Sequence, residues 1–206
     1  IWLFTNIKEV IYLCSRFELN ISKLDLLKRY NKKQITKFNP KTEVFPGQQI
    51  LTLCDEFDHM RWGIDVDFMK KSIINSRIEK IYTSKFFKED FECRRCLIPA
   101  TAFFEWNQKN KDKYRLTVAN QQIFSIAGIF REYKSQETSI RHVSMLTTEA
   151  KGLIAEIHTR MPIILPQSFE QTYLHGENSK EIHEFLLDNF IDLDMENLSD
   201  SQLTFL

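Results

Sequence analysis

The segment from residue 93 to residue 147 carries successive strand patterns with no helical pattern between them, and this feature constrains the fold most. The strand patterns lie at 94–106, 114–118, 123–130 and 142–148 and are rich in β-branched and aromatic residues. Parallel strands need a crossover, usually a helix, between them, so this order argues against a doubly wound parallel sheet. The sequence therefore predicts an α+β fold with a curved, mostly antiparallel, barrel-like sheet and peripheral helices.

Amphipathic patterns on both sides of this segment predict the peripheral helices. Ser22 and Asp25 form a capping box, with aspartate in place of the usual glutamate, for a short helix that ends near Tyr30. Apolar residues at helical spacing predict further helices. These begin at Arg77, after Thr147 or Thr148, at residue 168 and at residue 179. Residues 191–206 are acidic, and we expect loose structure there.

The length of the chain and its charge limit the class of protein. A chain of 206 residues can bury one substantial core, and no linker rich in proline, glycine or serine divides it, so we expect a single domain. Lysine plus arginine equal aspartate plus glutamate at 28 each, so the molecule as a whole presents no field that attracts a polyanion. A nucleic-acid site would have to be a local basic patch.

The four cysteines indicate a reducing compartment, because a chain of this size needs no disulfides to stabilise its core. We therefore expect a cytoplasmic protein. Cys93 and Cys96 form one C-x-x-C pair, but the second ligand pair that a structural zinc site requires is missing. Core thiols on a strand are the favoured interpretation over a metal or redox site, and we expect no metal and no cofactor.

Residues 1–13 precede the first motif of interest. They are apolar, but Lys8 and Glu9 interrupt them, and the run is too short to cross a bilayer. They also lack the basic start and the small-residue cleavage site of a secretory signal. We interpret 1–13 as an extension that is absent from the mature chain, which leaves 14–206 as the single domain, with no membrane association.

The strand pattern at 94–106 ends with a carboxylate, Glu105, between Phe104 and Trp106. Desolvation by aromatic neighbours would raise the pKa of this carboxyl group toward neutrality, which suits a group that transfers protons. The alternative is an outward-facing residue of an alternating strand.

Four groups fall at the ends of predicted elements, where loops often carry function: Cys14, Asn75, Glu105 and His158. Taken singly, Cys14 could be a core thiol, Asn75 a turn residue and His158 a helix C-terminal cap. Together they supply a nucleophile, an amide, a carboxylic acid and a proton carrier. This set is sufficient for covalent chemistry on a carbonyl group.

Ten short motifs resemble those of a known family and occur in the family's order between residues 14 and 166. They are Cys14-Ser-Arg-Phe17, Val44-x-Pro46-Gly47, Trp62-Gly63, Ile74-Asn75-Ser-Arg77, Phe87-Lys88, Arg94-Arg-Cys-Leu-Ile-Pro-Ala100, Phe104-Glu105-Trp106, Ile126-Ala-Gly128-Ile-Phe130, Thr147-Thr148-x-Ala150 and Ile157-His158-x-Arg160-Met-Pro162. The motifs that contain Glu105 and His158 are the least expected by chance. The chain thus resembles the SRAP family, the SOS response-associated peptidase-like proteins.

In that family the initiator methionine is removed, and the exposed cysteine reacts with the ring-opened aldehyde of an abasic site in single-stranded DNA. The resemblance implies a thiazolidine crosslink through Cys14 that protects the lesion in the DNA damage response, with lyase-like reversal. It also implies a monomer that associates with the nucleoid when bound to DNA. An N-terminal cysteine suits this chemistry because its amine (pKa about 7.7–8.0) and its thiol (about 8.5) both titrate near neutrality.

The resemblance also implies roles for other residues. Glu105 would transfer the protons of imine formation and Asn75 would hold the amine or a sugar oxygen. His158 would assist opening of the deoxyribose ring and release of the crosslink. The implied DNA-binding residues are Arg16, Arg77, Lys88, Arg94, Trp106, Thr148 and Arg160. Of these, two arginines, Arg77 and Arg160, would hold phosphates beside the lesion.

Some positions depart from the family's pattern. Ser15 replaces the glycine after the cysteine, and Glu43 replaces an asparagine. Phe68 or Met69 could stack on a base, but acidic residues in the same loop would repel DNA. The family's C-terminal strand has no clear counterpart in 192–206. These differences bear on substrate handling more than on the fold.

Cys14 is internal in this sequence, and a peptide nitrogen cannot form an imine, so the mechanism requires removal of residues 1–13. One hypothesis is that translation starts at position 13. Two alternatives stay open. One is a thiol peptidase, either general or restricted to self-cleavage, in which His158 is the base for Cys14. The other is a non-covalent binder of single-stranded DNA in which Cys14 is inert.

Overall fold

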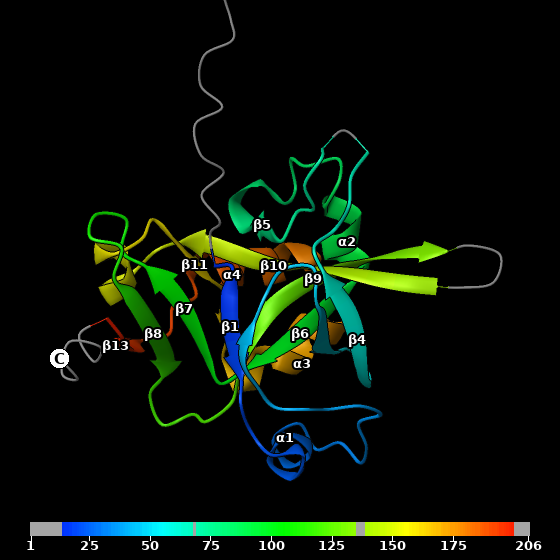
Figure 1. Cartoon of the computed structure of the whole chain (residues 1–206). Coiled ribbons are helices and arrows are strands. Elements are labelled where there is room, and N and C mark those ends of the chain that lie inside the picture. Colours follow the sequence, from blue (N-terminus) through cyan, green and yellow to red (C-terminus); the bar gives the residue numbers. More distant parts are fainter. Residues whose placement is uncertain (1–13, 68, 135–138, 200–206) are drawn as a thin grey trace, which may run out of the picture.

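A computed structural model describes residues 14–67, 69–134 and 139–199 (Figure 1). Within these ranges the strands form a five-stranded sheet with the order β13-β8-β7-β1-β2 and an eight-stranded sheet. The first sheet contains β1 (Arg16–Leu19), β2 (Lys41–Val44), β7 (Ala102–Trp106), β8 (Lys113–Val118) and β13 (Leu193–Asn197). The second contains β3 (Gln49–Leu53), β4 (Phe57–Trp62), β5 (Asn75–Arg77), β6 (Arg95–Ala100), β9 (Phe124–Lys134), β10 (Ser139–Glu149), β11 (Arg160–Pro162) and β12 (Ile164–Leu165).

The second sheet closes on itself. Its strands pair in the order β10-β4-β3-β6-β9, and β9 pairs in turn with β10, so these five strands form a closed barrel. β10 runs parallel to β4 and to β5, whereas the other pairings of both sheets in the described part are antiparallel. The predicted α+β class with a mostly antiparallel, barrel-like sheet is confirmed.

The two sheets share one apolar core. Phe17 of β1 and Trp62 of β4 meet edge to face, with ring centroids 5.3 Å apart, and both are buried. Only Thr101 separates β6 from β7, so the chain passes from the barrel to the five-stranded sheet over a single residue, and the Thr101 N–H donates to Glu18 O (2.7 Å). This short connection fixes the inner face of β7 against the barrel.

Short helices surround the sheets. They are α1 (Lys23–Arg29), α2 (Lys88–Cys93), α3 (Glu170–His175) and α4 (Ser179–Asp188), with the 3-10 helices η1 (Ile78–Lys80), η2 (Gly152–Glu156) and η3 (Gln167–Phe169). Ser22 caps α1 as predicted, because Ser22 Oγ accepts from Asp25 N (3.1 Å), and the Asp25 carboxylate accepts from the Ser22 hydroxyl group (2.6 Å). No helix in the described part is both long and apolar enough to cross a membrane.

Two predicted helices were wrong. The segment from Arg77 forms the end of β5 and then the short η1, because Asn75–Arg77 pair with Met145–Thr147 of β10. No helix begins at Thr147 or Thr148 either, since both threonines lie in β10 between β5 and β11 and only η2 follows. Strand partners on both sides outweighed the local helical pattern.

The expectations for the C-terminal segment and for the C-x-x-C pair also need correction. Leu193–Asn197 is not loosely structured: it forms β13, which pairs with β8 from Leu193 opposite Val118 to Asn197 opposite Tyr114. Cys93 ends α2 and is exposed, whereas Cys96 is buried in β6, so only Cys96 is a core thiol on a strand.

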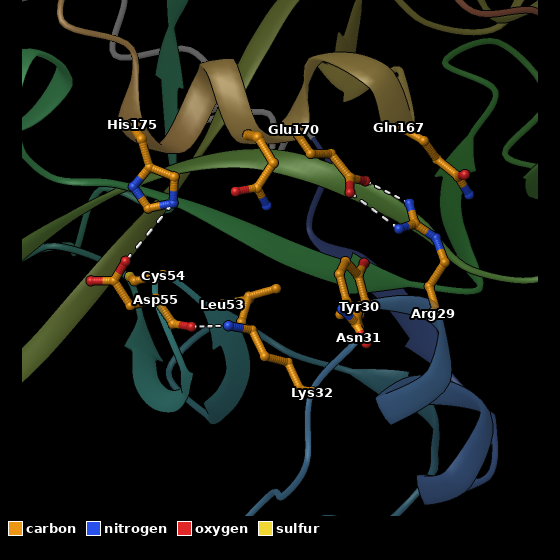
Figure 2. A pocket seen from close by; sticks show the side chains of 11 residues that line it. Arg29, Tyr30, Asn31, Lys32, Leu53, Cys54, Asp55, Gln167, Glu170 and His175 are labelled. Atoms are coloured by element: carbon orange, nitrogen blue, oxygen red, sulfur yellow. Dashed lines mark hydrogen bonds and ion pairs between the residues drawn. The ribbon is translucent and has the colours of Figure 1, made fainter.

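A buried polar network anchors α1 and α3 to the barrel at the end of β1 opposite Cys14 (Figures 1 and 2). Arg29 donates two hydrogen bonds to the Glu170 carboxylate (3.1 and 2.5 Å), which also accepts from Ser125 Oγ (2.6 Å). The Tyr30 hydroxyl lies 2.8 Å from Ser125 Oγ. The network borders a polar cavity of ≈ 290 Å³ between α1, the end of β3 and α3. Since the carboxylate is satisfied on several sides, the network serves to hold these elements together.

Candidate functional site

Cys14 and Glu105 form the centre of the candidate site. Cys14 lies just before β1, and β1 pairs antiparallel with β7, the strand that carries Glu105. The Cys14 backbone N–H donates to Glu105 Oε1 (2.7 Å), and both residues are only 2% exposed. Cys14 has a φ of 46°, a conformation that is uncommon for residues other than glycine. In this conformation its nitrogen faces the carboxyl group.

Alternation along β7 decides where Glu105 points. Phe103 and Glu105 share one face of the strand, and Phe103 belongs to the apolar core. Phe104 and Trp106 lie on the opposite face, where Lys113 Nζ is 4.5 and 5.4 Å from their respective ring centroids. Glu105 is therefore not an outward-facing strand residue.

The environment of Glu105 changes its protonation. Burial raises the pKa of Glu105 to about 7, although hydrogen bonds from the Cys14 thiol, the Cys14 N–H and the Trp106 N–H act in the opposite direction. A carboxyl group with this pKa is present in both protonation states at neutral pH. It can therefore both accept and donate a proton under physiological conditions.

The Cys14 thiol is held in its neutral form. Burial raises its pKa well above the usual value, and the charge of Glu105 and its hydrogen bond to the thiol act in the same direction. The positive charge of Arg160 acts in the opposite direction, which places that guanidinium close enough to influence the thiol. A nucleophilic role of Sγ therefore requires transfer of the thiol proton to a neighbouring base.

His158 lies on the turn that leads into β11. Gln108 N donates to Ile157 O (3.2 Å), which joins this turn to the segment after β7. Arg160 N donates to His158 Nδ1 (3.1 Å), so the neutral ring carries its proton on Nε2. Burial lowers the pKa of His158. Only the protonated ring can donate from Nδ1 to the Arg160 carbonyl (3.3 Å), and this hydrogen bond offsets the effect of burial only in part. The imidazole is therefore mostly neutral at pH 7.

Arg160 is buried beside these groups. Its guanidinium donates to both carboxylate oxygens of Glu79 (2.7 and 2.9 Å) and to the carbonyl (2.8 Å) and hydroxyl (3.2 Å) oxygens of Thr147. The Glu79 carboxylate also accepts from Thr148 Oγ1 (3.4 Å). Of the predicted DNA-binding residues, Arg160 and Thr148 thus lie in one hydrogen-bonded cluster.

β5 brings Asn75 and Arg77 to the same edge of the barrel. Asn75 lies opposite Met145 and Arg77 lies opposite Thr147 of β10. Asn75 is half-buried, whereas Arg77 is exposed. Because Thr147 is the residue whose carbonyl holds Arg160, both arginines border the same part of β10.

The other predicted DNA-binding residues have different surroundings. Arg16 donates to Ser15 O (2.8 Å) and lies over the Phe45 ring at 4.0 Å, two residues from Cys14 in the chain. Trp106 is half-buried at the end of β7. Lys88 and Arg94 belong to the α2 region, and their ion pairs are formed with acids of that helix. These pairs are Lys88–Glu92 (3.9 Å), Arg94–Glu89 (3.0 Å) and Arg94–Asp90 (2.7 Å).

Sequence reasoning missed Glu79. The available signal was its position two residues after Arg77, directly after the strand that carries Asn75. Two other expectations fall on residues outside the described ranges: the extension 1–13 and the stacking role of Phe68. Met69, the alternative to Phe68, is 47% exposed.

No group of three or more His, Cys, Asp or Glu side chains in the described part of the chain is arranged to hold a metal ion. The four cysteines are all free thiols. The candidate site itself contains a cysteine, a carboxyl group, an imidazole and an arginine.

The nitrogen and the thiol of Cys14 both face a buried carboxyl group. This arrangement places a nucleophile next to a proton-transfer group, which is the class of site that can support covalent chemistry. The comparison with known families is specific. The model of the SOS response associated peptidase (SRAP) family matches residues 13–201, and the chain belongs to this family.

Similar proteins are found in several organisms. The chain is 28% identical over 184 residues to the abasic site processing protein YoqW of Bacillus subtilis, with 81% of this chain and 82% of that protein covered. It is 25% identical over 158 residues to the abasic site processing protein YedK of Escherichia coli, with coverage of 73% and 69%.

Solved structures share the fold. A crystal structure of a protein from Bacteroides thetaiotaomicron superposes with a TM-score of 0.80 at 22% identity and covers 93% of this chain and 94% of its own. A phage-related protein of Bordetella bronchiseptica superposes with a TM-score of 0.75 at 18% identity, with coverage of 90% and 94%. The barrel and the attached sheet are therefore an architecture found in experimental structures.

Proposed function

We propose that this protein binds single-stranded DNA at abasic sites and forms a covalent thiazolidine with the lesion through Cys14. The observation that carries the proposal is the 2.7 Å separation of the Cys14 nitrogen from Glu105 Oε1. When Cys14 is the first residue, this nitrogen is its α-amine, and a proton-transfer group is already within hydrogen-bonding distance. The names of the relatives, abasic site processing proteins, support the same substrate.

The reaction involves two bonds to one carbon atom. The Cys14 amine adds to the aldehyde carbon of the ring-opened abasic sugar, and the resulting carbinolamine loses water to give an imine. Sγ then adds to the imine carbon as its proton passes, by way of a base, to the nitrogen. The product contains one C–N and one C–S bond in a five-membered ring, and the net loss is one water molecule.

Glu105 is suited to the proton transfers in this sequence. Burial raises the pKa of this carboxyl group. Its carboxylate form can take a proton from the ammonium group or from the thiol, and its acid form can protonate the departing hydroxyl group. The thiol needs such a base, because its own pKa is well above the usual value. His158, with its proton on Nε2, would donate a hydrogen bond to the deoxyribose ring oxygen during ring opening. Asn75 would hold the amine or a sugar oxygen.

The proposal requires that Cys14 be exposed by removal of residues 1–13. A peptide nitrogen has no second proton to lose and cannot form an imine. The protein is expressed from its native gene and purified, and intact-mass spectrometry is expected to show a chain that begins at Cys14. A mature chain that still carries residues 1–13 would contradict the proposal.

The covalent step is tested with three proteins and one DNA. A chain produced with Cys14 as its verified first residue, its Cys14→Ala variant and its Cys93→Ala variant are incubated with a single-stranded oligonucleotide that contains one abasic site. We expect a heat-stable adduct with the first and third proteins and none with Cys14→Ala. Cys93 is the matched control because it is an exposed thiol. An adduct that persists in Cys14→Ala, or its absence with the first protein, would overturn the proposal.

A thiol peptidase is supported less well. Such an enzyme needs a thiolate that an imidazole generates. Here the hydrogen-bond partner of the Cys14 thiol is Glu105, and the pKa of the thiol is raised rather than lowered. A purely non-covalent binder would give salt-dependent affinity but no adduct in the same assay.

A further inference from the structure

Arg160 is a buried arginine, and one of its three guanidinium nitrogens has no hydrogen-bond partner in the described part of the chain. Both terminal nitrogens of its guanidinium are engaged by Glu79 and Thr147. Nε is buried, and within the described part of the chain it has no hydrogen-bond partner. A buried N–H group without an acceptor destabilises a fold, so a donor of this kind requires an explanation.

The Glu79 carboxylate connects three segments of the chain. Its carboxylate accepts from Arg160 of β11, from Thr148 Oγ1 (3.4 Å) and from the Glu149 N–H (3.1 Å) of β10, while Glu79 itself belongs to η1. Partial burial acts to raise the pKa of Glu79, but the hydrogen bonds from Arg160 and from backbone N–H groups lower it below the ordinary value. The carboxylate is therefore ionised at neutral pH and stays bound to Arg160.

The pairing fixes the orientation of a flexible side chain. A free arginine side chain has many rotamers, and a bidentate carboxylate restricts them before any ligand binds. Arg160 N donates to His158 Nδ1 (3.1 Å), so the oriented arginine belongs to the segment that carries the candidate site's imidazole. Glu79 engages only the terminal nitrogens, so an anionic oxygen could accept from Nε–H without displacing it. Because Nε is buried, this contact requires the atoms that cover Nε to move aside when the ligand binds.

We propose that Glu79 is a positioning residue that directs Arg160 Nε–H to a phosphodiester oxygen of single-stranded DNA next to the abasic sugar. This inference rests on the proposed function for the identity of the ligand. It assigns to an acidic residue a favourable role in binding a polyanion, which is opposite to its simple Coulombic effect.

That opposition gives a sharp test. If Glu79 acted only through its charge, its removal would reduce repulsion of the phosphates and strengthen binding. If it orients Arg160, removal weakens binding because the phosphate contact is lost. The two accounts therefore predict changes of opposite sign for Glu79→Gln.

The experiment measures equilibrium binding to a single-stranded oligonucleotide with one tetrahydrofuran abasic analogue, by fluorescence anisotropy at several salt concentrations. The analogue has no aldehyde, so it reports binding without crosslinking. Glu79→Gln is expected to weaken binding about tenfold, equivalent to about 1.4 kcal/mol. The slope of log K against log salt is expected to decrease in magnitude by about 0.7, the value for one lost phosphate contact on a single strand.

Matched variants separate orientation from charge and from folding. Glu156→Gln makes the same change of charge at an exposed position of η2 and is expected to bind like the wild type or slightly more tightly. Arg160→Gln combined with Glu79→Gln is expected to bind no more weakly than Arg160→Gln alone, because the two residues act as one unit. Thermal unfolding checks that each variant is folded.

Glu79→Gln leaves the buried Arg160 charge unpaired, which can unfold the protein. If Glu79→Gln is unfolded, Glu79→Asp tests the positioning role, because it keeps the charge and only shortens the side chain. We expect it to weaken binding severalfold at unchanged net charge. Binding as tight as the wild type with an unchanged salt slope, in Glu79→Gln or in a folded Glu79→Asp, would overturn the inference.

The outcomes also separate this inference from the proposed function. Weakened binding of the analogue by Glu79→Gln, together with no adduct on a true abasic site, would support the positioning role and refute the covalent chemistry. A normal adduct together with unchanged binding of the analogue by Glu79→Gln would refute the positioning role and support the covalent chemistry. Absence of any binding of single-stranded DNA by the wild type would refute both.

Discussion

Replacement of Glu105 by glutamine should remove a pH-dependent loss of stability. Glu105 is 2% exposed and burial raises its pKa to about 7 from the ordinary value of 4.5. The folded state therefore holds this proton more tightly than the unfolded state. Its contribution to the free energy of unfolding is fully present below pH 4.5 and is lost as the pH rises through about 7.

The magnitude follows from the two pKa values. A difference of about 2.5 units at 1.36 kcal/mol per unit amounts to about 3 kcal/mol. Glutamine cannot ionise, and its Oε1 can still accept from the Cys14 N–H. We therefore expect Glu105→Gln to gain about 3 kcal/mol of stability relative to the wild type between pH 4.5 and pH 8. The same variant should lose crosslinking, because the proton-transfer group is gone.

The assay is urea unfolding of the full chain, residues 1–13 included, at pH 4.5, 6 and 8. Circular dichroism monitors the unfolding. The quantity compared is the difference in unfolding free energy between the two proteins at each pH. Other groups, including His158, titrate in both proteins and are subtracted. Equal m-values in the two proteins are required for the comparison.

Cys14→Ser is the matched control. It removes the reactive thiol but keeps a hydroxyl group that can donate to Glu105, so the loss of stability with rising pH should persist. The Cys14 thiol does not contribute over this range, since its pKa lies well above the usual value. A difference between Glu105→Gln and the wild type that stays constant from pH 4.5 to pH 8 would refute the argument that burial governs this carboxyl group.

Two further substitutions test the packing around the barrel. Gly128→Ala would place a Cβ 3.0 Å from Cys96 Sγ and 3.0 Å from Ile98 Cδ1, so we expect it to destabilise the fold by about 1–3 kcal/mol in urea unfolding. A neutral effect would show that β6 and β9 can separate. Arg29→Met leaves the buried carboxylate of Glu170 without its cation and should destabilise by about 3–5 kcal/mol. Adding Glu170→Gln should recover most of that loss, and failure to do so would mean that the ion pair is not the cause.

Several features could be predicted from local sequence. The strand patterns between residues 93 and 147 correspond to β6 to β10, and the absence of helical patterns among them led to the correct fold class. Ser22 begins α1 as its capping box predicts. These predictions succeed because periodicity and capping depend on residues within a few positions of one another.

Predictions failed where tertiary contacts competed with a local pattern. Thr147 and Thr148 lie in an extended strand rather than at the start of a helix, because β10 has partners on both edges. Leu193–Asn197 becomes β13 although the segment is acidic, because the edge of β8 offers a register in which Leu193 is buried. The gain from strand pairing is not visible in the segment alone.

The sequence by itself determined which groups are available: a cysteine before the first strand, a carboxylate among aromatic residues, and the His158-x-Arg160 motif before a proline. The tertiary structure decided which of them meet. The Cys14–Glu105 contact joins residues 91 positions apart, and the Arg160–Glu79 pair joins residues 81 positions apart. Such contacts depend on closure of the barrel and on the register of β1 with β7, and both arise from the free energy of the whole fold rather than from any local pattern.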